Sequence, residues 1–240
     1  MRRISLSLAL LLLATPALAL SKAPYVTPAE IDLTTMLPPP PAKGSSREKL
    51  DIAVVLEAQK RRTPAQAAKV QKDAVSTVFQ FVDVLGPQFN KKNLPRLDAF
   101  FTKLIADSNE PSAVAKDKWA RPRPYTVNPA IKPPGDMIKS TISKKYGTPT
   151  FSYPSGHALF GVESAIILSE MVSEKRAQLF ARGWDLGNSR IIGGVHFPTD
   201  VEAGRINGTL MAALMMQKPA FRADMAEAKR ELRKVLKLSP

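Results

Sequence analysis

The two histidines of this 240-residue chain lie in two short stretches that are rich in residues suited to binding an anion. His157 stands in YPSGHALF and His196 in SRIIGGVHFPTD, and a third stretch, KDKWARPRPY, adds basic side chains. A site that cleaves a phosphate ester without a metal needs fixed cations and N–H donors around the phosphoryl group, a nucleophile in line with the leaving oxygen, and an acid. The three stretches together hold groups of each kind, so we treat them as one candidate site.

The stretch KDKWARPRPY supplies cations at fixed spacing. Lys116 and Arg123 are separated by six residues, and prolines on both sides of Arg123 stiffen its backbone. A guanidinium held in this way can bind two phosphate oxygens at once, while a lysine acts as a point charge. Taken alone, the stretch is more typical of a basic surface patch.

The stretch YPSGHALF predicts a turn directly before a long apolar helix. The start of that helix presents free N–H groups, Ser155 can donate its hydroxyl, and Gly156 lets the backbone approach an anion closely. His157 then lies in the first helical turn, beside the bound group. The alternative is that Ser155 is a simple N-cap and the histidine is incidental.

The stretch SRIIGGVHFPTD predicts a helix end, a sharp turn and a new helix start. Gly193-Gly194 allows the turn that carries His196 back toward the site, and Asp200 follows four residues later. A carboxylate there can hold the imidazole N–H and stabilise the charged ring. Arg190 precedes the turn, and Thr199–Glu202 resembles a capping box. Compensation of helix dipoles would by itself explain both Arg190 and Asp200.

Helical patterns must position these stretches, since alternating strand patterns are almost absent. We expect an all-α, compact bundle of about seven to nine helices, with loops at 119–135, 147–156 and 193–198 exposing the site. Ser45 with Glu48, and Thr63 with Gln66, predict capping boxes. The expected helical stretches are one from Ser45 onward, 67–85, 94–107, 112–118, 157–172, 174–192, 199–216 and 221–238.

The first nineteen residues have the features of a secretory signal peptide. Two arginines precede a mostly apolar run, and Ala17-Leu18-Ala19 fits the small-residue cleavage rule. The run is shorter than the ~20 residues of a spanning helix, and no later run is long enough. We therefore expect export to the periplasm without a stable membrane span. A Pro-rich extended arm over 20–44 and a single all-α domain over 45–240 would follow.

Composition narrows the chemistry further. The chain has no cysteine, which excludes cysteine nucleophiles, zinc–thiolate sites and iron–sulfur clusters. Its 35 basic and 21 acidic residues give a net charge of +14, and removal of Arg2 and Arg3 with the signal leaves 33 against 21, or +12. Such a charge favours anionic partners but does not choose among phosphorylated small molecules, nucleic acid and membrane surfaces.

The order and spacing of the three stretches resemble a known family. The pattern Lys-x6-Arg-Pro, then Pro-Ser-Gly-His, then Ser-Arg-x5-His-x3-Asp is similar to that of the phosphatidic acid phosphatase type 2 superfamily, which includes vanadium haloperoxidases. The segments SYPSGHA and RGWDLGNSRIIGGVHFPTDVEAGR more closely resemble bacterial class A non-specific acid phosphatases. The resemblance covers most of the mature chain and is strongest over 116–205.

The resemblance implies a role for each residue. His196 would be the nucleophile that forms a phosphohistidine, Asp200 would orient it, and His157 would protonate the leaving alcohol. It implies no metal or other cofactor, and small-molecule phosphate monoesters as substrates at acidic pH. No nucleic acid is expected as a specific partner, and a homo-oligomer stays open. The residues implied to hold the phosphoryl oxygens are Lys116, Arg123, Ser155, Gly156 and Arg190.

Two departures and three alternatives accompany this interpretation. Phe151 replaces a glycine and Ala158 a threonine of the subgroup pattern, which puts the breadth of substrates in question. A lipid or polyprenyl phosphate phosphatase would use the same site, but the expected lack of membrane spans opposes it. A vanadate-dependent peroxidase is generally a much longer chain. A non-catalytic anion-binding protein suits the charge, but it leaves the placement of both histidines unexplained.

Overall fold

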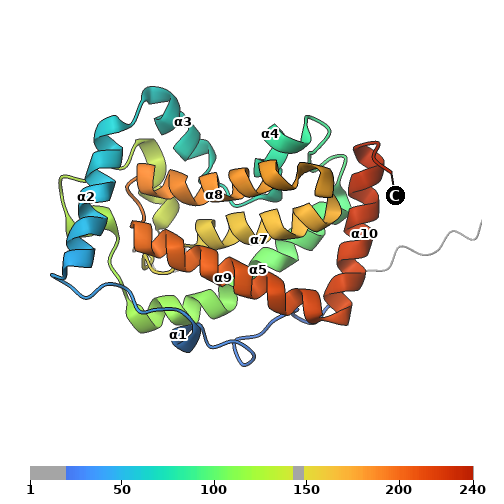
Figure 1. Ribbon diagram of the computed structural model, residues 1–240, viewed down its shortest axis with the longest axis horizontal. Coiled ribbons are helices and arrows are strands. Elements are labelled where there is room, and N and C mark those ends of the chain that lie inside the picture. The colour runs from blue at the N-terminus through green and yellow to red at the C-terminus, as the bar shows by residue number, and fades with distance from the viewer. Residues whose placement is uncertain (1–19, 143–148, 240) are drawn as a thin grey trace, which may run out of the picture.

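The computed structural model describes residues 20–142 and 149–239 (Figure 1). This part of the chain contains ten α-helices and four 3-10 helices and no β-strand, so the all-α prediction is confirmed. The number of α-helices exceeds seven to nine because three of them, α1 (Leu33–Met36), α4 (Val82–Leu85) and α6 (Pro124–Val127), are single four-residue turns. The predicted signal peptide, and residues 147 and 148 of one predicted loop, lie outside the described residues. The α-helices are α1 (Leu33–Met36), α2 (Ser46–Arg61), α3 (Pro64–Lys72), α4 (Val82–Leu85), α5 (Pro95–Trp119), α6 (Pro124–Val127), α7 (Gly156–Met171), α8 (Arg176–Ile192), α9 (Pro198–Gln217) and α10 (Pro219–Val235), and the 3-10 helices are η1 (Val78–Phe81), η2 (Gly135–Met137), η3 (Lys139–Thr141) and η4 (Ser173–Lys175).

Helix α7 lies in the middle of the bundle, between α8 and α9, with α10 across one end (Figure 1). Glycines allow the neighbouring backbones to come close. A Cβ on Gly183 of α8 would strike the carbonyl of Gly161, and a Cβ on Gly204 of α9 would strike the carbonyl of Ser155. The glycines of these helices thus bring α8 and α9 into close contact with α7. In the described ranges, no helix is long and apolar enough to cross a membrane.

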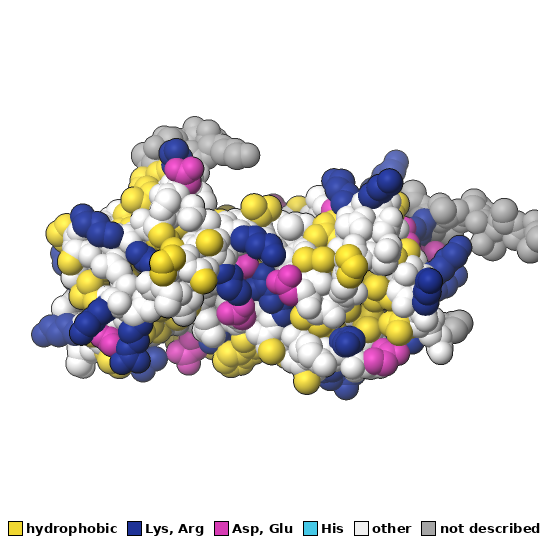
Figure 2. Space-filling model, turned by 90° about the horizontal axis from the view of Figure 1, so that it is seen from above, with side chains coloured by type: hydrophobic (Ala, Val, Ile, Leu, Met, Phe, Trp, Pro, Cys, Tyr) yellow, Lys and Arg dark blue, Asp and Glu magenta, His cyan; other side chains and the backbone are white. Residues whose placement is uncertain are grey.

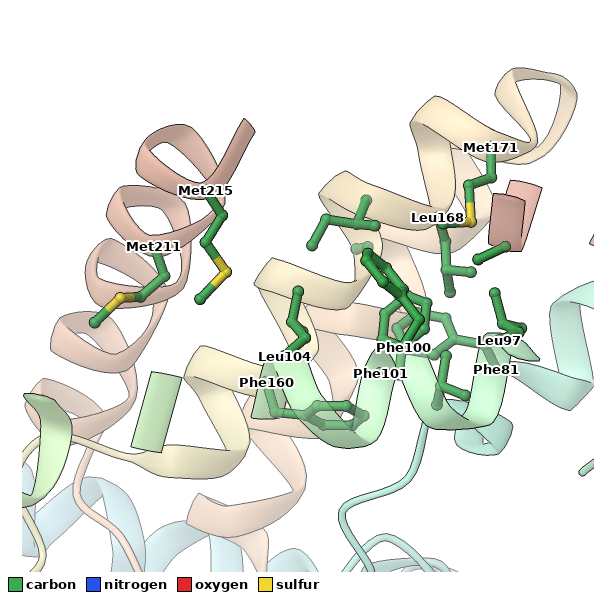
Figure 3. Close-up of a cluster of buried hydrophobic side chains, with 14 of the residues drawn as sticks. Phe81, Leu97, Phe100, Phe101, Leu104, Phe160, Leu168, Met171, Met211 and Met215 are labelled. Atoms are coloured by element: carbon green, nitrogen blue, oxygen red, sulfur yellow. The ribbon is translucent and has the colours of Figure 1, made fainter. Parts of the chain in front are cut away.

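The main hydrophobic core lies between α5, α7, α9 and α10. Phenylalanine, leucine and methionine side chains from these helices and from η1 interdigitate there (Figure 3). Residues 20–44 contribute to the same core through Tyr25, Ile31 and Leu33 of the α1 region. On the face shown in Figure 2, basic side chains are interspersed with acidic and apolar ones, and no histidine is visible. His196 is buried and His157 is half-buried.

Two predicted helix boundaries are wrong. The stretch 67–85 is not one helix, because α3 ends at Lys72 and η1 begins only at Val78. Asp73, which caps α3, is fully buried against Arg182, and this tertiary contact overrides the local periodicity. Conversely, 94–107 and 112–118 form the single helix α5, which continues through Pro111. Pro111 lacks an N–H for the carbonyl four residues before it, but it is buried in the packed face of α5.

The predicted capping boxes are formed to different extents. Thr63 and Gln66 make both hydrogen bonds of the box at the start of α3. Ser45 accepts from the Glu48 N–H at 3.2 Å, but the Glu48 carboxylate accepts from Gly44 rather than from Ser45. Both helices nevertheless begin where the capping residues predicted.

Candidate active site

The three stretches meet at the end of the bundle where α7 begins. They enclose a cavity of about 370 Å³. Five of the eight predicted site residues line it, and the other three, Ser155, Arg190 and Asp200, are buried in the same stretches. The cavity is lined by Ser76, Ile105, Asn109, Lys116, Arg123, Ser140, Thr150, Gly156, His157, Leu159, Phe160 and His196.

Asp200 holds one edge of the His196 ring. Its Oδ2 lies 3.4 Å from His196 Nδ1, and the carboxylate also accepts from the Phe197 N–H at 2.8 Å. Ser152 Oγ and Arg121 Nη1 donate to it, each at 2.5 Å. Burial opposes the negative charge of Asp200, but these hydrogen bonds and the positive charge of Arg121 hold its pKa at about 2. Asp200 is therefore ionised and available to stabilise a charged imidazole.

The opposite ring nitrogen of His196 reaches the cavity. The Nδ1 proton is directed at Asp200, so Nε2 carries a lone pair. His196 Nε2 lies 3.2 Å from Arg123 Nη1 and accepts a hydrogen bond from it. Burial and the nearby Arg123 lower the pKa of His196 to about 3, so the ring is neutral in the free protein. A neutral imidazole with an unprotonated Nε2 is the form that can attack phosphorus.

The turn between α8 and α9 places His196 and Asp200 at this spacing. Gly194 adopts a φ of +68°, which glycine allows, and the Arg190 carbonyl accepts from the N–H groups of Val195 and His196. The predicted capping box at Thr199–Glu202 is wrong. Helix α9 begins at Pro198, so Asp200 occupies its third position and accepts from Phe197. Asp200 thus caps α9 and holds His196.

Arg123 and Lys116 are held by neutral oxygens. Arg123 donates to the carbonyl and the hydroxyl of Thr150, both at 2.7 Å, and to the Val195 carbonyl at 2.8 Å. Lys116 Nζ donates to the carbonyls of Pro154 at 2.5 Å and Phe151 at 3.0 Å. Burial and the charge of Arg123 lower the pKa of Lys116 to about 7, and burial lowers that of Arg123 to about 10. Such partly desolvated cations gain most from a bound anion.

The start of α7 brings His157 to the cavity. Ser155 is the N-cap, and its Oγ accepts from the Ala158 N–H at 3.4 Å, which is the capping role that the sequence left open. Its hydroxyl proton can still be donated. His157 Nε2 lies 3.0 Å from the Ala74 carbonyl, so this nitrogen carries a proton and donates it. Burial and the charge of Arg190 lower the pKa of His157 to about 3.

Arg190 is almost fully enclosed, with 1% of its surface exposed. Its Nη2 donates to the Val70 carbonyl at 2.6 Å and, with Nε, to the Ser189 hydroxyl. Its Nη1 is buried and has no hydrogen-bond partner among the described residues. Burial lowers the pKa of Arg190 to about 10. A buried donor without a partner is costly, and a phosphoryl oxygen would satisfy it.

The sequence did not identify the groups that hold Asp200. Arg121 lies over the Phe197 ring and links Asp200 to Asp51 of α2, at 2.8 Å from Asp51 Oδ2. Ser152 donates to the same carboxylate. Arg121 was visible as a member of the basic stretch, but Asp51 lies in an ordinary amphipathic helix 70 residues away. No local pattern could have connected the two.

Comparison with known proteins gives consistent matches. The model of the PAP2 superfamily matches residues 99–224. The non-specific acid phosphatase of Providencia stuartii is 31% identical over 212 residues, which are 86% of this chain and 83% of that protein. The one from Salmonella typhimurium (strain LT2) is 30% identical over 218 residues, which are 87% and 84% of the two chains.

A solved structure has the same fold. It is the crystal structure of a transmembrane PAP2 type phosphatidylglycerolphosphate phosphatase from Bacillus subtilis, with a TM-score of 0.50. The match covers 73% of this chain and 87% of that one, at 17% identity. At that identity the likeness concerns the arrangement of the helices.

Proposed function

The chain belongs to the PAP2 superfamily, and from this premise we propose that it is an acid phosphatase that hydrolyses small phosphate monoesters through a phosphohistidine on His196. The observation that carries the proposal is the pair of histidines at one cavity, one backed by the Asp200 carboxylate and both beside Lys116 and Arg123. Cations on one side of a nucleophile suit the transfer of a dianionic phosphoryl group.

Binding comes first. Lys116 and Arg123 bind the phosphoryl oxygens at the cavity wall, together with the first N–H groups of α7. Arg190, whose charge acts on His157 and whose Nη1 has no hydrogen-bond partner among the described residues, is the third cation for these oxygens. The dianion offsets the positive charges that lower the pKa of His157. Binding therefore raises that pKa, and an acidic medium completes the protonation of His157.

Transfer then proceeds in two steps. His196 Nε2 attacks phosphorus while the bond to the leaving oxygen breaks, and the proton on His157 passes to that oxygen. Asp200 stabilises the positive charge that the phosphorylated imidazole carries. In the second step a water attacks phosphorus and loses a proton to His157, the P–N bond breaks, and inorganic phosphate and neutral His196 result.

The size of the cavity favours soluble esters over lipid phosphates. About 370 Å³ holds a phosphoryl group and a small alcohol. Turnover of short soluble esters should therefore exceed that of lipid phosphates presented in detergent. The reverse order would favour the lipid phosphatase alternative.

The proposal is tested by hydrolysis of p-nitrophenyl phosphate at pH 5–6 with a chelator present. We expect turnover by the wild type, and a loss of about a thousandfold or more in a folded His196→Ala variant. Ser140→Ala, at the cavity wall, is the control and should keep most of the activity. A folded wild type without turnover, or a fully active His196→Ala, would contradict the proposal.

We also propose that the protein is exported to the periplasm. The support is the sequence pattern of residues 1–19. Amino-terminal sequencing of protein recovered from the periplasm of an expressing bacterium should read from near Leu20. Recovery of the uncleaved chain in the cytoplasm alone would contradict export.

A further inference from the structure

The two histidines are oriented by different kinds of group. His196 has the Asp200 carboxylate at Nδ1, whereas His157 Nε2 donates to the backbone carbonyl of Ala74 at 3.0 Å. Ala74 lies in the turn between α3 and η1, where the local pattern predicted an unbroken helix. A neutral acceptor fixes the ring but stabilises its charged form less than a carboxylate does. This suits a histidine that has to release its proton.

The turn that carries Ala74 is held by a buried ion pair. Asp73 is fully buried, and Arg182 of α8 contacts both of its oxygens, with Nη2–Oδ1 at 2.6 Å and Nη1–Oδ2 at 3.3 Å. Lys69 Nζ donates to the same carboxylate at 2.8 Å. Two-point contact between a guanidinium and a carboxylate fixes direction as well as distance. The backbone directly before Ala74 is thereby tied to α8.

The backbone on both sides of Ala74 is tied to the same arginine through Gln80. Gln80 Nε2 donates to the carbonyls of Lys72 at 2.7 Å and Val75 at 3.0 Å. Arg182 in turn donates from Nε to the Gln80 carbonyl at 3.0 Å and from Nη2 to Gln80 Oε1 at 3.3 Å. The segment therefore has little freedom to move its Ala74 carbonyl away from His157.

We propose that Arg182, acting with Asp73 and Gln80, is a positioning residue for proton transfer by His157. It does not line the cavity, so it acts through the Ala74 carbonyl. With Nε2–H directed at that carbonyl, the proton delivered to the leaving oxygen is the one on Nδ1. The inference rests on the acid role of His157 in the proposed function.

The test compares two esters that depend differently on the acid. p-Nitrophenyl phosphate has a good leaving group, whereas glycerol phosphate has a poor one and needs its oxygen protonated. Arg182→Met and Gln80→Leu should each lower kcat on glycerol phosphate about tenfold more than on p-nitrophenyl phosphate, with KM nearly unchanged. The quantity compared is the ratio of kcat on glycerol phosphate to kcat on p-nitrophenyl phosphate. In a His157→Ala background, Arg182→Met and Gln80→Leu should not change this ratio further. Arg176→Met, on the exposed side of α8, is the matched control and should leave the ratio unchanged.

The outcomes separate the inference from the proposed function. If His157→Ala lowers the ratio but folded Arg182→Met and Gln80→Leu do not, the positioning role is wrong while the acid role stands. If His157→Ala itself leaves the ratio unchanged, the acid role of His157 fails. Gln80→Leu keeps the Arg182–Asp73 pair, so it decides the question if Arg182→Met does not fold. Circular dichroism and Tm establish folding for each variant.

Discussion

At the scale of single residues, the cations of the cavity carry less hydration than surface cations, and this lowers their pKa values. Lys116 is the clearest case, since its pKa is lowered to about 7 by burial and by Arg123. It is charged below that pH and neutral above it. The affinity of the free site for anions should therefore decline as pH rises through neutrality.

Sulfate as a competitive inhibitor tests this directly, because its charge does not change between pH 5 and 9. We expect its inhibition constant for the wild type to rise by up to about tenfold per pH unit above pH 7. Lys116→Met should bind sulfate more weakly at pH 6 and lose most of this rise. Lys118→Met, exposed on the same helix, should retain the wild-type profile. Equal pH profiles for wild type and Lys116→Met would contradict the pKa shift.

At the scale of elements, a buried polar cluster joins α5, α7 and α9. Ser108 Oγ donates to Glu163 Oε1 at 2.6 Å, and Asn207 Nδ2 donates to Ser112 Oγ at 2.9 Å. Glu163 Oε2 has no hydrogen-bond partner among the described residues. Burial raises the pKa of Glu163 from 4.5 to about 8, so the carboxyl is neutral at acidic pH. The junction is thus suited to acidic conditions.

Glu163 should make stability fall with rising pH. A raised folded-state pKa means that its contribution is complete below pH 4.5 and is lost as pH rises through about 8. We expect the wild-type Tm to decline between pH 5 and 9, and Glu163→Gln to remove most of that decline. Glu170→Gln, exposed on the same helix, is the control. Identical Tm profiles for wild type and Glu163→Gln would show that Glu163 does not titrate in this range.

The close contact between α7 and α9 leads to a second prediction at the scale of elements. In Gly204→Ala the new methyl group would strike the Ser155 carbonyl, which cannot move without shifting the start of α7. We expect a loss of about 1–3 kcal/mol in the free energy of unfolding and a lower kcat. Urea unfolding measures the first and steady-state kinetics the second. Thr209→Ala, on the exposed side of α9, should change neither, and a Gly204→Ala with wild-type values would refute the close packing.

The sequence predicted those features that depend on neighbouring residues. The helical class, the Ser155 cap before α7 and the i,i+4 spacing of His196 and Asp200 follow from local pattern. The break after α3 could not be predicted, because the Asp73–Arg182 pair that stabilises it joins residues 109 positions apart. The same holds for Asp51 and Arg121. At Pro111 the sequence predicted a break between two helices, but α5 continues through it. Packing of Pro111 in the core outweighs its missing hydrogen bond.

At the scale of the whole molecule, residues 20–44 connect the two ends of the chain. The Tyr25 N–H donates to Asp107 of α5 at 2.9 Å, and its hydroxyl donates to Asp224 of α10 at 2.6 Å. The ring packs against Phe221 and Phe100. Asp224 also accepts from the Ser21 N–H at 2.9 Å, so the arm is fixed to α10 at two points.

Two substitutions separate the hydrogen bond of Tyr25 from its packing. Tyr25→Phe should cost about 1–2 kcal/mol in the free energy of unfolding, because the ring stays and the charge-assisted hydrogen bond is lost. Tyr25→Ala should cost about 3–5 kcal/mol, because a buried ring is removed as well. Chemical denaturation measures both, and activity at saturating substrate should change little in folded protein. A Tyr25→Phe as stable as the wild type would mean that the arm contributes by packing alone.

The proposed reaction passes through one covalent bond, between phosphorus and His196 Nε2. It is tested most directly by mixing the enzyme with excess p-nitrophenyl phosphate at low temperature, quenching in alkali, and locating the added phosphoryl group by mass spectrometry of the peptides. We expect one phosphoryl group on His196 in the wild type and none anywhere in His196→Ala. A phosphoryl group on another residue, or steady turnover by His196→Ala at the wild-type rate, would contradict it.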